Sequence, residues 1–177
     1  PLGEIEIDTA AADNIVKAAH IVDVDDYAHT QEHSIEVQLP WLQYLHGSRF
    51  KFVPICFLMQ DLESSREVGL AVAKALQNKS ALVIASTDMT HYESQDAAQK
   101  KDKAVIEEAL KLEEEKMYSN VEGMRGSLCG YGPAIAAITA SKELGAKNGK
   151  LLCYKTSGDV VHDYSAVVGY TSIMLSR

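Results

Sequence analysis

A short apolar run, followed at once by polar residues, constrains the fold of this chain most. Residues 81–85 are all apolar and have polar neighbours on both sides. A strand that is buried on both faces carries such a run, so the pattern predicts a strand of a parallel sheet. The polar residues 86–91 follow directly, where the carboxyl end of that strand would lie.

Strand and helix patterns alternate along the rest of the chain. Helices are expected near residues 9–20, 34–45, 61–76, 96–116 and 134–144, and strands near residues 4–7, 50–57, 81–85, 151–155 and 164–175. Pro40 is expected to kink or break its helix, because proline removes one backbone hydrogen bond. Alternation of this kind predicts an α/β fold, with a mostly parallel sheet flanked by helices. A chain of 177 residues is long enough to form this as a single domain, residues 1–177.

Charge and composition exclude several classes of protein. The formal net charge of −8 argues against a nucleic-acid surface, which needs clustered lysine and arginine. The apolar stretches are too short to span a membrane. Three scattered cysteines are too few for a disulfide framework, which favours a reducing, cytoplasmic location. A homo-oligomer is left open.

The polar segment after the expected central strand carries a carboxylate and an imidazole. Asp88 and His91 are three residues apart, so both side chains share one face if the turn opens a helix. An aspartate can orient a histidine ring and raise its basicity, as acid–base catalysis requires. The alternative is a helix-capping aspartate beside a surface histidine. The position at a strand's carboxyl end, where α/β sheets bind ligands, favours a site.

A second polar group stands before the expected helix at residues 34–45. Glu32 and His33 could belong to the carboxylate and imidazole set of a non-haem iron site. They could equally be helix-start residues, where the dipole favours negative charge.

Cys129 stands close to the start of another expected helix. The positive end of that helix would favour the thiolate, which is the form that binds metals and attacks electrophiles. The alternative is a small packed residue. Cys56 and Cys153 lie in apolar strand patterns and are expected to be packed residues.

The motifs together resemble those of the Memo-like family. The resemblance covers essentially the whole chain and rests on the following segments: Pro-Leu-Gly-Glu-Ile at 1–5, Glu-His-Ser-Ile-Glu-Val-Gln-Leu-Pro at 32–40, Ser-Thr-Asp-Met-Thr-His-Tyr at 86–92, Cys-Gly-Tyr-Gly-Pro at 129–133 and Thr-Ser-Gly-Asp at 156–159. It implies an archaeal or bacterial protein with a fold like that of the LigB-type class III extradiol dioxygenases. Those enzymes open catechol rings with non-haem iron.

The resemblance also implies a site. Glu32, His33, Asp88 and His91 match pocket-lining positions and are carried over as catalytic candidates, and Cys129 is carried over as the one metal-ligand candidate. The family's histidine-bearing Pro-His-Ala-Gly and Gly-Pro-x-His motifs are absent, so the N-terminal part of the domain is expected to be missing. Fe or Cu is implied for the full-length protein, and no tightly bound metal is expected in this chain. The resemblance supplies no settled substrate.

Three functions remain as hypotheses. The first is a metal-dependent, dioxygenase-like oxidoreductase. The second is a non-catalytic module that binds a peptide or a small anion on the same scaffold, since fold alone does not decide function. The third is a hydrolase with Cys129 as nucleophile and His91 as base. In each, His33, Asp88, His91 and Cys129 are expected to converge on one pocket.

Overall fold

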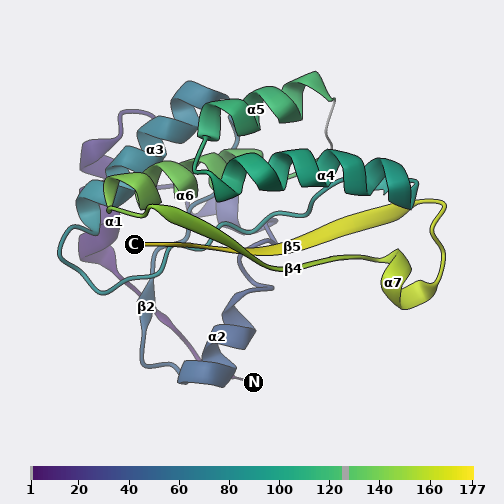
Figure 1. Ribbon diagram of the computed structural model, residues 1–177. Coiled ribbons are helices and arrows are strands. Elements are labelled where there is room, and N and C mark those ends of the chain that lie inside the picture. Colours follow the sequence, from purple (N-terminus) through teal and green to yellow (C-terminus); the bar gives the residue numbers. More distant parts are fainter. Residues whose placement is uncertain (1, 125–127) are drawn as a thin grey trace.

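The structure, a computed structural model, describes residues 2–124 and 128–177 (Figure 1). In chain order the helices are α1 (Thr9–Ala18), the 3-10 helix η1 (Tyr27–His29), α2 (Leu39–His46), α3 (Leu62–Ala75), α4 (Gln95–Leu110), α5 (Glu114–Gly123), α6 (Tyr131–Glu143) and α7 (Gly158–Val161). The strands are β1 (Glu6–Ile7), β2 (Lys51–Phe52), β3 (His91–Glu93), β4 (Asn148–Thr156) and β5 (Val167–Ser176). The architecture is mixed α/β, as the sequence predicts at the level of fold class.

The described strands form two small sheets and not one mostly parallel sheet. Strands β1 and β2 pair in parallel, whereas the larger sheet has the order β3-β5-β4 and is antiparallel throughout. Strands β4 and β5 follow one another with only the short α7 between them. A parallel pair would need a crossover of a dozen or more residues, so this connection imposes the antiparallel arrangement.

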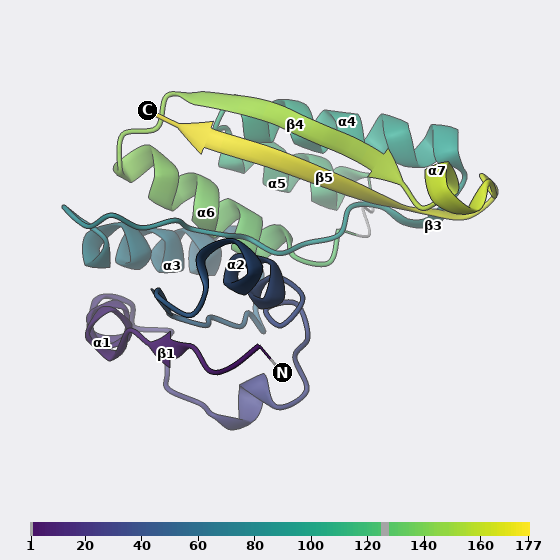
Figure 2. The same cartoon turned by 90° about the horizontal axis from the view of Figure 1, so that it is seen from below.

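The apolar run at residues 81–85 is extended but belongs to no strand, so its prediction as a buried strand was wrong. Leu82 is 75% exposed and Ile84 is 45% exposed, while Val83 packs against the core. Among the described residues, no backbone hydrogen bond involves residues 81–86. The segment passes beside α3 and α6 on its way to β3 (Figure 2). Burial on both faces requires a neighbouring strand, and the described residues provide none.

Two expected helices differ from the observed ones for local reasons. Helix α2 begins at Leu39, so Pro40 lies in its first turn and causes no kink. Proline is tolerated there because the first-turn N–H groups have no partner within the helix. The expected helix at 96–116 divides into α4 and α5 around Leu112, whose φ of 58° is left-handed. Aspartates cap the starts of α1 and α3: Asp8 accepts from the N–H of Ala11, and Asp61 from that of Ser64, both at 2.9 Å.

Helix α6 lies between two hydrophobic clusters. One cluster joins it to α1 and α3 through Ala136 and Ala140, and the other joins it to α4, α5 and β5 through Ile138. Figure 2 shows α6 between α3 and the β4–β5 pair. A helix that is apolar around most of its circumference suits such a position. The start of α6 is therefore a firmly held point in the fold.

Helices α3 and α6 approach each other closely at Gly69. A Cβ atom at Gly69 would lie 2.6 Å from the carbonyl oxygen of Ala136 and 2.7 Å from Cβ of Thr139. Both atoms are too near for ordinary contact, and one belongs to the backbone of a buried helix. The absence of a side chain at Gly69 thus sets the spacing of the two helices.

Replacing Gly69 by alanine should lower the free energy of unfolding by about 1–3 kcal/mol, the usual cost of overpacking. Gly123→Ala is the matched control, because a Cβ atom at Gly123 meets nothing within 4 Å. The control should leave stability unchanged or raise it by less than about 1 kcal/mol. Urea denaturation followed by circular dichroism measures both. Equal effects from the two substitutions would contradict the close approach.

Candidate functional site

The polar segment at residues 86–91 meets the segment that precedes α6. The Sγ atom of Cys129 accepts a hydrogen bond from the backbone N–H of Asp88 at 3.2 Å, and Thr87 Oγ1 lies 3.8 Å from the same sulfur. The hydroxyl oxygen of Thr87 also accepts from the N–H of Gly130 at 2.9 Å. These contacts join two parts of the chain that are about 40 residues apart in sequence.

Glycine and glutamine hold Cys129 in this position. A Cβ atom at Gly130 would lie 2.6 Å from the carbonyl oxygen of Ser86, so only glycine permits this approach. The side chain of Gln60 donates to the carbonyl oxygen of Cys129 at 3.0 Å and accepts from the N–H of Gly132 at 2.9 Å. Cys129 itself is exposed. The thiol is thus accessible and stands where a backbone N–H points at it.

Asp88 and His91 lie close together at the start of β3. Asp88 Oδ2 is 3.8 Å from His91 Nε2, and the two side chains are 48% and 21% exposed respectively. This distance is longer than a hydrogen bond, and a small side-chain movement would allow one. The pair can orient the ring and hold a proton, which is what an acid–base group requires. Asp88 and His91 therefore join Cys129 in one local group.

Glu32 and His33 lie on the turn before α2. The Glu32 carboxylate accepts from the backbone N–H groups of His33 at 2.7 Å and Ser34 at 2.6 Å, and these hydrogen bonds lower the pKa of Glu32. In the described part of the chain, no hydrogen bond or ion pair joins the side chain of Glu32 or His33 to Asp88 or Cys129. Three of the five predicted residues are linked in series: the Cys129 sulfur contacts the backbone of Asp88, and the Asp88 carboxylate lies beside His91.

One bond connects the turn before α2 to the site segment. Gln38 Nε2 donates to Ser86 Oγ at 3.2 Å. This bond joins the segment that follows Glu32 and His33 to the site segment, and no described bond joins Glu32 or His33 themselves to Asp88 or Cys129. Their catalytic roles stay a prediction.

Sequence reasoning missed a second thiol that has an imidazole partner. Cys56 Sγ lies 3.1 Å from His29 Nδ1 on η1. Burial raises the pKa of the Cys56 thiol, and the nearby Glu32 carboxylate raises it further. The two partners are 27 residues apart and lie in unrelated patterns, so the sequence held no signal for this pair.

Cys153 differs from its expected setting. It lies on β4 as predicted, but it is exposed and not packed. The apolar residues that surround it in sequence predict a buried strand. Among the described residues, β4 has β5 on one side and no strand on the other.

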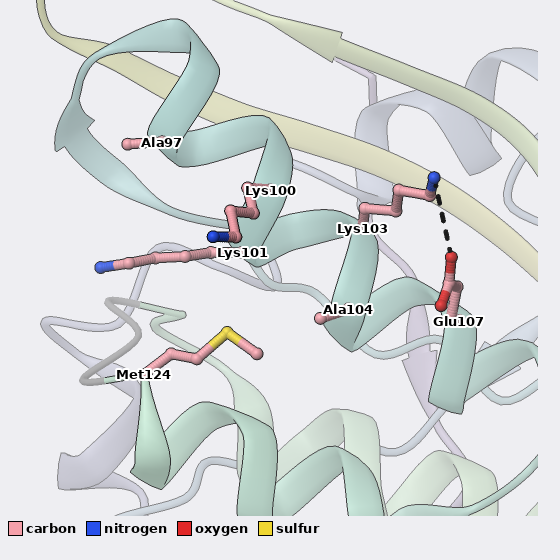
Figure 3. A pocket seen from close by; sticks show the side chains of 7 residues that line it. All are labelled: Ala97, Lys100, Lys101, Lys103, Ala104, Glu107 and Met124. Carbon is pink, nitrogen blue, oxygen red and sulfur yellow. Dashed lines mark ion pairs between the residues drawn. The ribbon is translucent and has the colours of Figure 1, made fainter.

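Two hollows in the structure lie apart from the five predicted residues. An apolar groove of about 730 Å³ extends between α1, α2, α3 and the unpaired segment, with Ser34, Ser86 and Pro133 among its lining residues. A second hollow, of about 510 Å³, lies between α4 and the end of α5 (Figure 3). Lys100, Lys101 and Lys103 line it, and Lys103 forms an ion pair with Glu107 at 3.9 Å. The first hollow adjoins the site segment at Ser86, and the second contains none of the predicted residues.

The described residues do not bring enough possible ligands together to hold a metal ion. Residues 2–124 and 128–177 contain no group of three or more histidine, cysteine, aspartate or glutamate side chains placed to hold one ion. A catalytic metal site takes about three protein ligands. The described residues by themselves therefore do not fit a complete metal centre, although Cys129 has the chemistry of a soft-metal ligand.

Comparison with known proteins defines the class. The family model of the Memo-like proteins matches residues 1–174 of this chain. A MEMO1 family protein of Methanococcus maripaludis is 51% identical over 180 residues, which cover 99% of this chain and 63% of that protein. A MEMO1 family protein of Methanopyrus kandleri is 51% identical over 179 residues, which cover 100% of this chain and 63% of that protein.

The chain belongs to the Memo-like family. It is also 48% identical to a MEMO1 family protein of Methanosarcina acetivorans over 177 residues, which cover 99% of this chain and 66% of the relative. The chain spans about 63% of the length of the first two relatives. In the described parts of the chain, no helix combines the length and the apolar character needed to cross a membrane.

Cys129 should be the fastest of the three cysteines to react with iodoacetamide at neutral pH. Cys129 is exposed, and its sulfur accepts a hydrogen bond from the backbone N–H of Asp88. Cys153 is exposed without such a donor among its described contacts, and the pKa of Cys56 is raised. Brief labelling followed by peptide mapping in a mass spectrometer ranks the three. First labelling of Cys56 or Cys153, with Cys129 protected, would contradict the assigned role.

Replacing Glu32 by glutamine should increase the labelling rate of Cys56. The carboxylate disfavours the neighbouring thiolate, so its removal lowers the pKa of Cys56 and raises the thiolate fraction at pH 7–8. A pKa change of one unit would give an increase of up to about tenfold. Glu36→Gln, on the exposed face of the same turn region, is the control. An unchanged rate in the Glu32 variant would show that burial alone sets this pKa.

Proposed function

We propose that this chain supplies one wall of a metal-dependent, dioxygenase-like oxidoreductase pocket. The observation that carries the proposal is the contact of the Cys129 sulfur with the backbone of Asp88, whose carboxylate lies 3.8 Å from His91. A thiol can bind a metal, an imidazole can give or accept a proton, and a carboxylate can orient the imidazole. Fe or Cu is the proposed metal, and its further ligands would come from outside the described residues.

In this proposal Cys129 is the protein's soft ligand. Coordination deprotonates a thiol, and the N–H of Asp88 already points at the sulfur, so the negative charge would be partly compensated before a metal binds. A bound metal would polarise the substrate as a Lewis acid or carry electrons. The described geometry supports the ligand role of the sulfur.

The proposed role of His91 is to give or accept a proton, with Asp88 as its orienting carboxylate. Asp88 Oδ2 lies 3.8 Å from the ring nitrogen, and the partial burial of His91 limits its exchange with bulk water. Glu32 and His33 would line the adjoining edge of the pocket, near the bond between Gln38 and Ser86.

Two other functions use the same residues differently. A module that binds a peptide or a small anion would use the apolar groove beside Ser86, with the polar group at its end. A cysteine hydrolase would need His91 within hydrogen-bonding distance of Cys129. The described hydrogen bonds of the Cys129 thiol go to Thr87 and Asp88, which favours the ligand role over the nucleophile role.

The product of the complete gene should carry stoichiometric Fe or Cu when it is purified without chelators. Cys129→Ser should reduce that content at least about tenfold, as loss of a first ligand does. Cys153→Ser, which changes an exposed thiol far from the site segment in sequence, should retain the metal. Elemental analysis by mass spectrometry measures all three proteins. Full metal content in the Cys129 variant would overturn the ligand role.

The 177-residue chain alone should lose added Fe or Cu on dialysis. About three ligands are needed for tight binding, and the described residues place fewer than three side chains together. Retention of one metal ion per chain would show that the ligands have been assigned wrongly. A metal-free complete protein with an unreactive Cys129 would favour the binding module. Rapid alkylation of Cys129 that is lost in His91→Ala would favour the hydrolase.

A further inference from the structure

A buried carboxylate on α4 faces the segment that carries the site. Asp102 is only 2% exposed. One of its oxygens, Oδ1, accepts from the backbone N–H of Thr90 at 3.0 Å, and the other, Oδ2, accepts from the hydroxyl of Tyr154 at 2.8 Å. Burial and this hydrogen bond to Asp102 raise the pKa of Tyr154, so its hydroxyl remains a donor. Both oxygens of the carboxylate are thus satisfied by neutral donors.

Such an arrangement is costly, because burial of a charge without a cationic partner is unfavourable. No basic side chain pairs with Asp102 in the ion pairs of the described residues. An apolar residue of similar size would fill the same space at lower cost. The cost indicates that the hydrogen bonds of Asp102 have a specific use.

The fold leaves space for this carboxylate at Gly169. A Cβ atom at Gly169 would collide with Oδ2 of Asp102 and would lie 3.0 Å from Cβ of Met89. Gly169 also exchanges two backbone hydrogen bonds of 2.9 Å with the site segment: its carbonyl oxygen accepts from Met89, and its N–H donates to Thr90. Asp102 and Gly169 therefore hold neighbouring peptide groups of one short stretch.

The stretch that they hold is irregular. Strand β3 pairs with β5 through His91 opposite Val168 and Glu93 opposite Val167, with a shift of register between them. Tyr92 lies between these pairs with a φ of 58°, a conformation that is unfavourable for a residue with a Cβ atom. Pairing with β5 is therefore irregular directly after His91. The N–H of Thr90, one residue before His91, is held by Asp102, in addition to the bond that the Thr90 carbonyl oxygen accepts from Gly169.

We propose that Asp102 is a positioning residue of the site, which fixes Thr90 and thereby sets where Asp88 and His91 stand beside Cys129. The inference rests on the proposed function only in taking these three residues as the site. It assigns Asp102 no contact with a substrate. The role belongs to its acceptor oxygens, so an amide of the same shape can replace the carboxylate: asparagine can accept from Thr90 and donate to the oxygen of Tyr154.

The test compares Asp102→Ala with Asp102→Asn and with Tyr154→Phe, all in the present chain. The alanine variant removes both acceptors. The phenylalanine variant removes only the Tyr154 hydroxyl that donates to Asp102 Oδ2, and Tyr154 lies outside the site segment. Two measurements are made on each: the labelling rate of Cys129 relative to that of Cys153, and the ring resonances of His91 in a long-range nitrogen–proton spectrum. Neither measurement needs a metal, a substrate or activity, so failure of the proposed function leaves the test intact.

Asp102→Ala should change the relative labelling rate of Cys129 at least about tenfold, the effect of one lost hydrogen bond to a charged group, and should shift the His91 ring resonances. Asp102→Asn should restore both values to within about threefold of the original, and Tyr154→Phe should leave them unchanged even where it lowers the melting temperature. A folded Asp102→Ala variant with unchanged Cys129 and His91 would overturn the proposal.

If Asp102→Ala does not fold, Gly169→Ala decides the question. A methyl group there displaces the carboxylate while its charge and size are kept. The same changes at Cys129 and His91 would support the positioning role. Unchanged values would show that Asp102 serves the fold alone.

Discussion

The contact between α3 and α6 at Gly69 is the constraint on which the rest of this structure depends. Since no side chain separates the helices there, α6 can lie deep between two hydrophobic clusters. The first cluster fixes α6 against α1 and α3, and the second fixes it against α4, α5 and β5. The segment of Cys129 leads directly into α6, so the thiol takes its position from a helix that is packed between two hydrophobic clusters.

A buried carboxylate also orients the helices around α6. Glu114, at the start of α5, has a side chain that is only 4% exposed, and it lies 2.7 Å from Lys142 of α6 and 3.7 Å from Arg66 of α3. Burial of these charges costs desolvation energy that their attraction offsets only in part. What the group adds is specificity, because only one relative placement of α3, α5 and α6 brings one acid between two bases. The fold thus uses two buried carboxylates, Glu114 between helices and Asp102 beneath the site.

The parts of the fold that were predictable are those that local chemistry determines. Asp8 and Asp61 cap their helices because an aspartate oxygen can reach the N–H three residues on, and Gly145 takes a φ of 94° after α6 because only glycine does so freely. The unpredictable parts depend on distant neighbours. Residues 81–85 carry the apolar pattern of a buried strand, yet their burial depends on which strands lie beside them, and the pattern cannot supply that information.

The candidate site divides in the same way. Asp88 and His91 were predicted from their spacing and their place after an apolar run, and the role of Cys129 was predicted from the resemblance to the Memo-like family. Gln60, Thr87 and Asp102 hold that group together, and each acts through a partner between 12 and 72 residues away in sequence or through a backbone atom, which leaves no local signature. Residues that support a site are harder to recognise from sequence than the residues that they support.

The unpaired segment at residues 81–86 affects how copies of this chain associate in solution. Its peptide groups make no backbone hydrogen bond within the described residues, and Leu82 and Ile84 present apolar side chains beside them. An extended apolar edge of this kind is a template on which an identical segment of another molecule can add, and such addition leads to aggregation. The net charge of −8 opposes the approach of like chains, and dissolved salt screens that repulsion. In concentrated solution, therefore, ionic strength governs how long this chain remains dispersed.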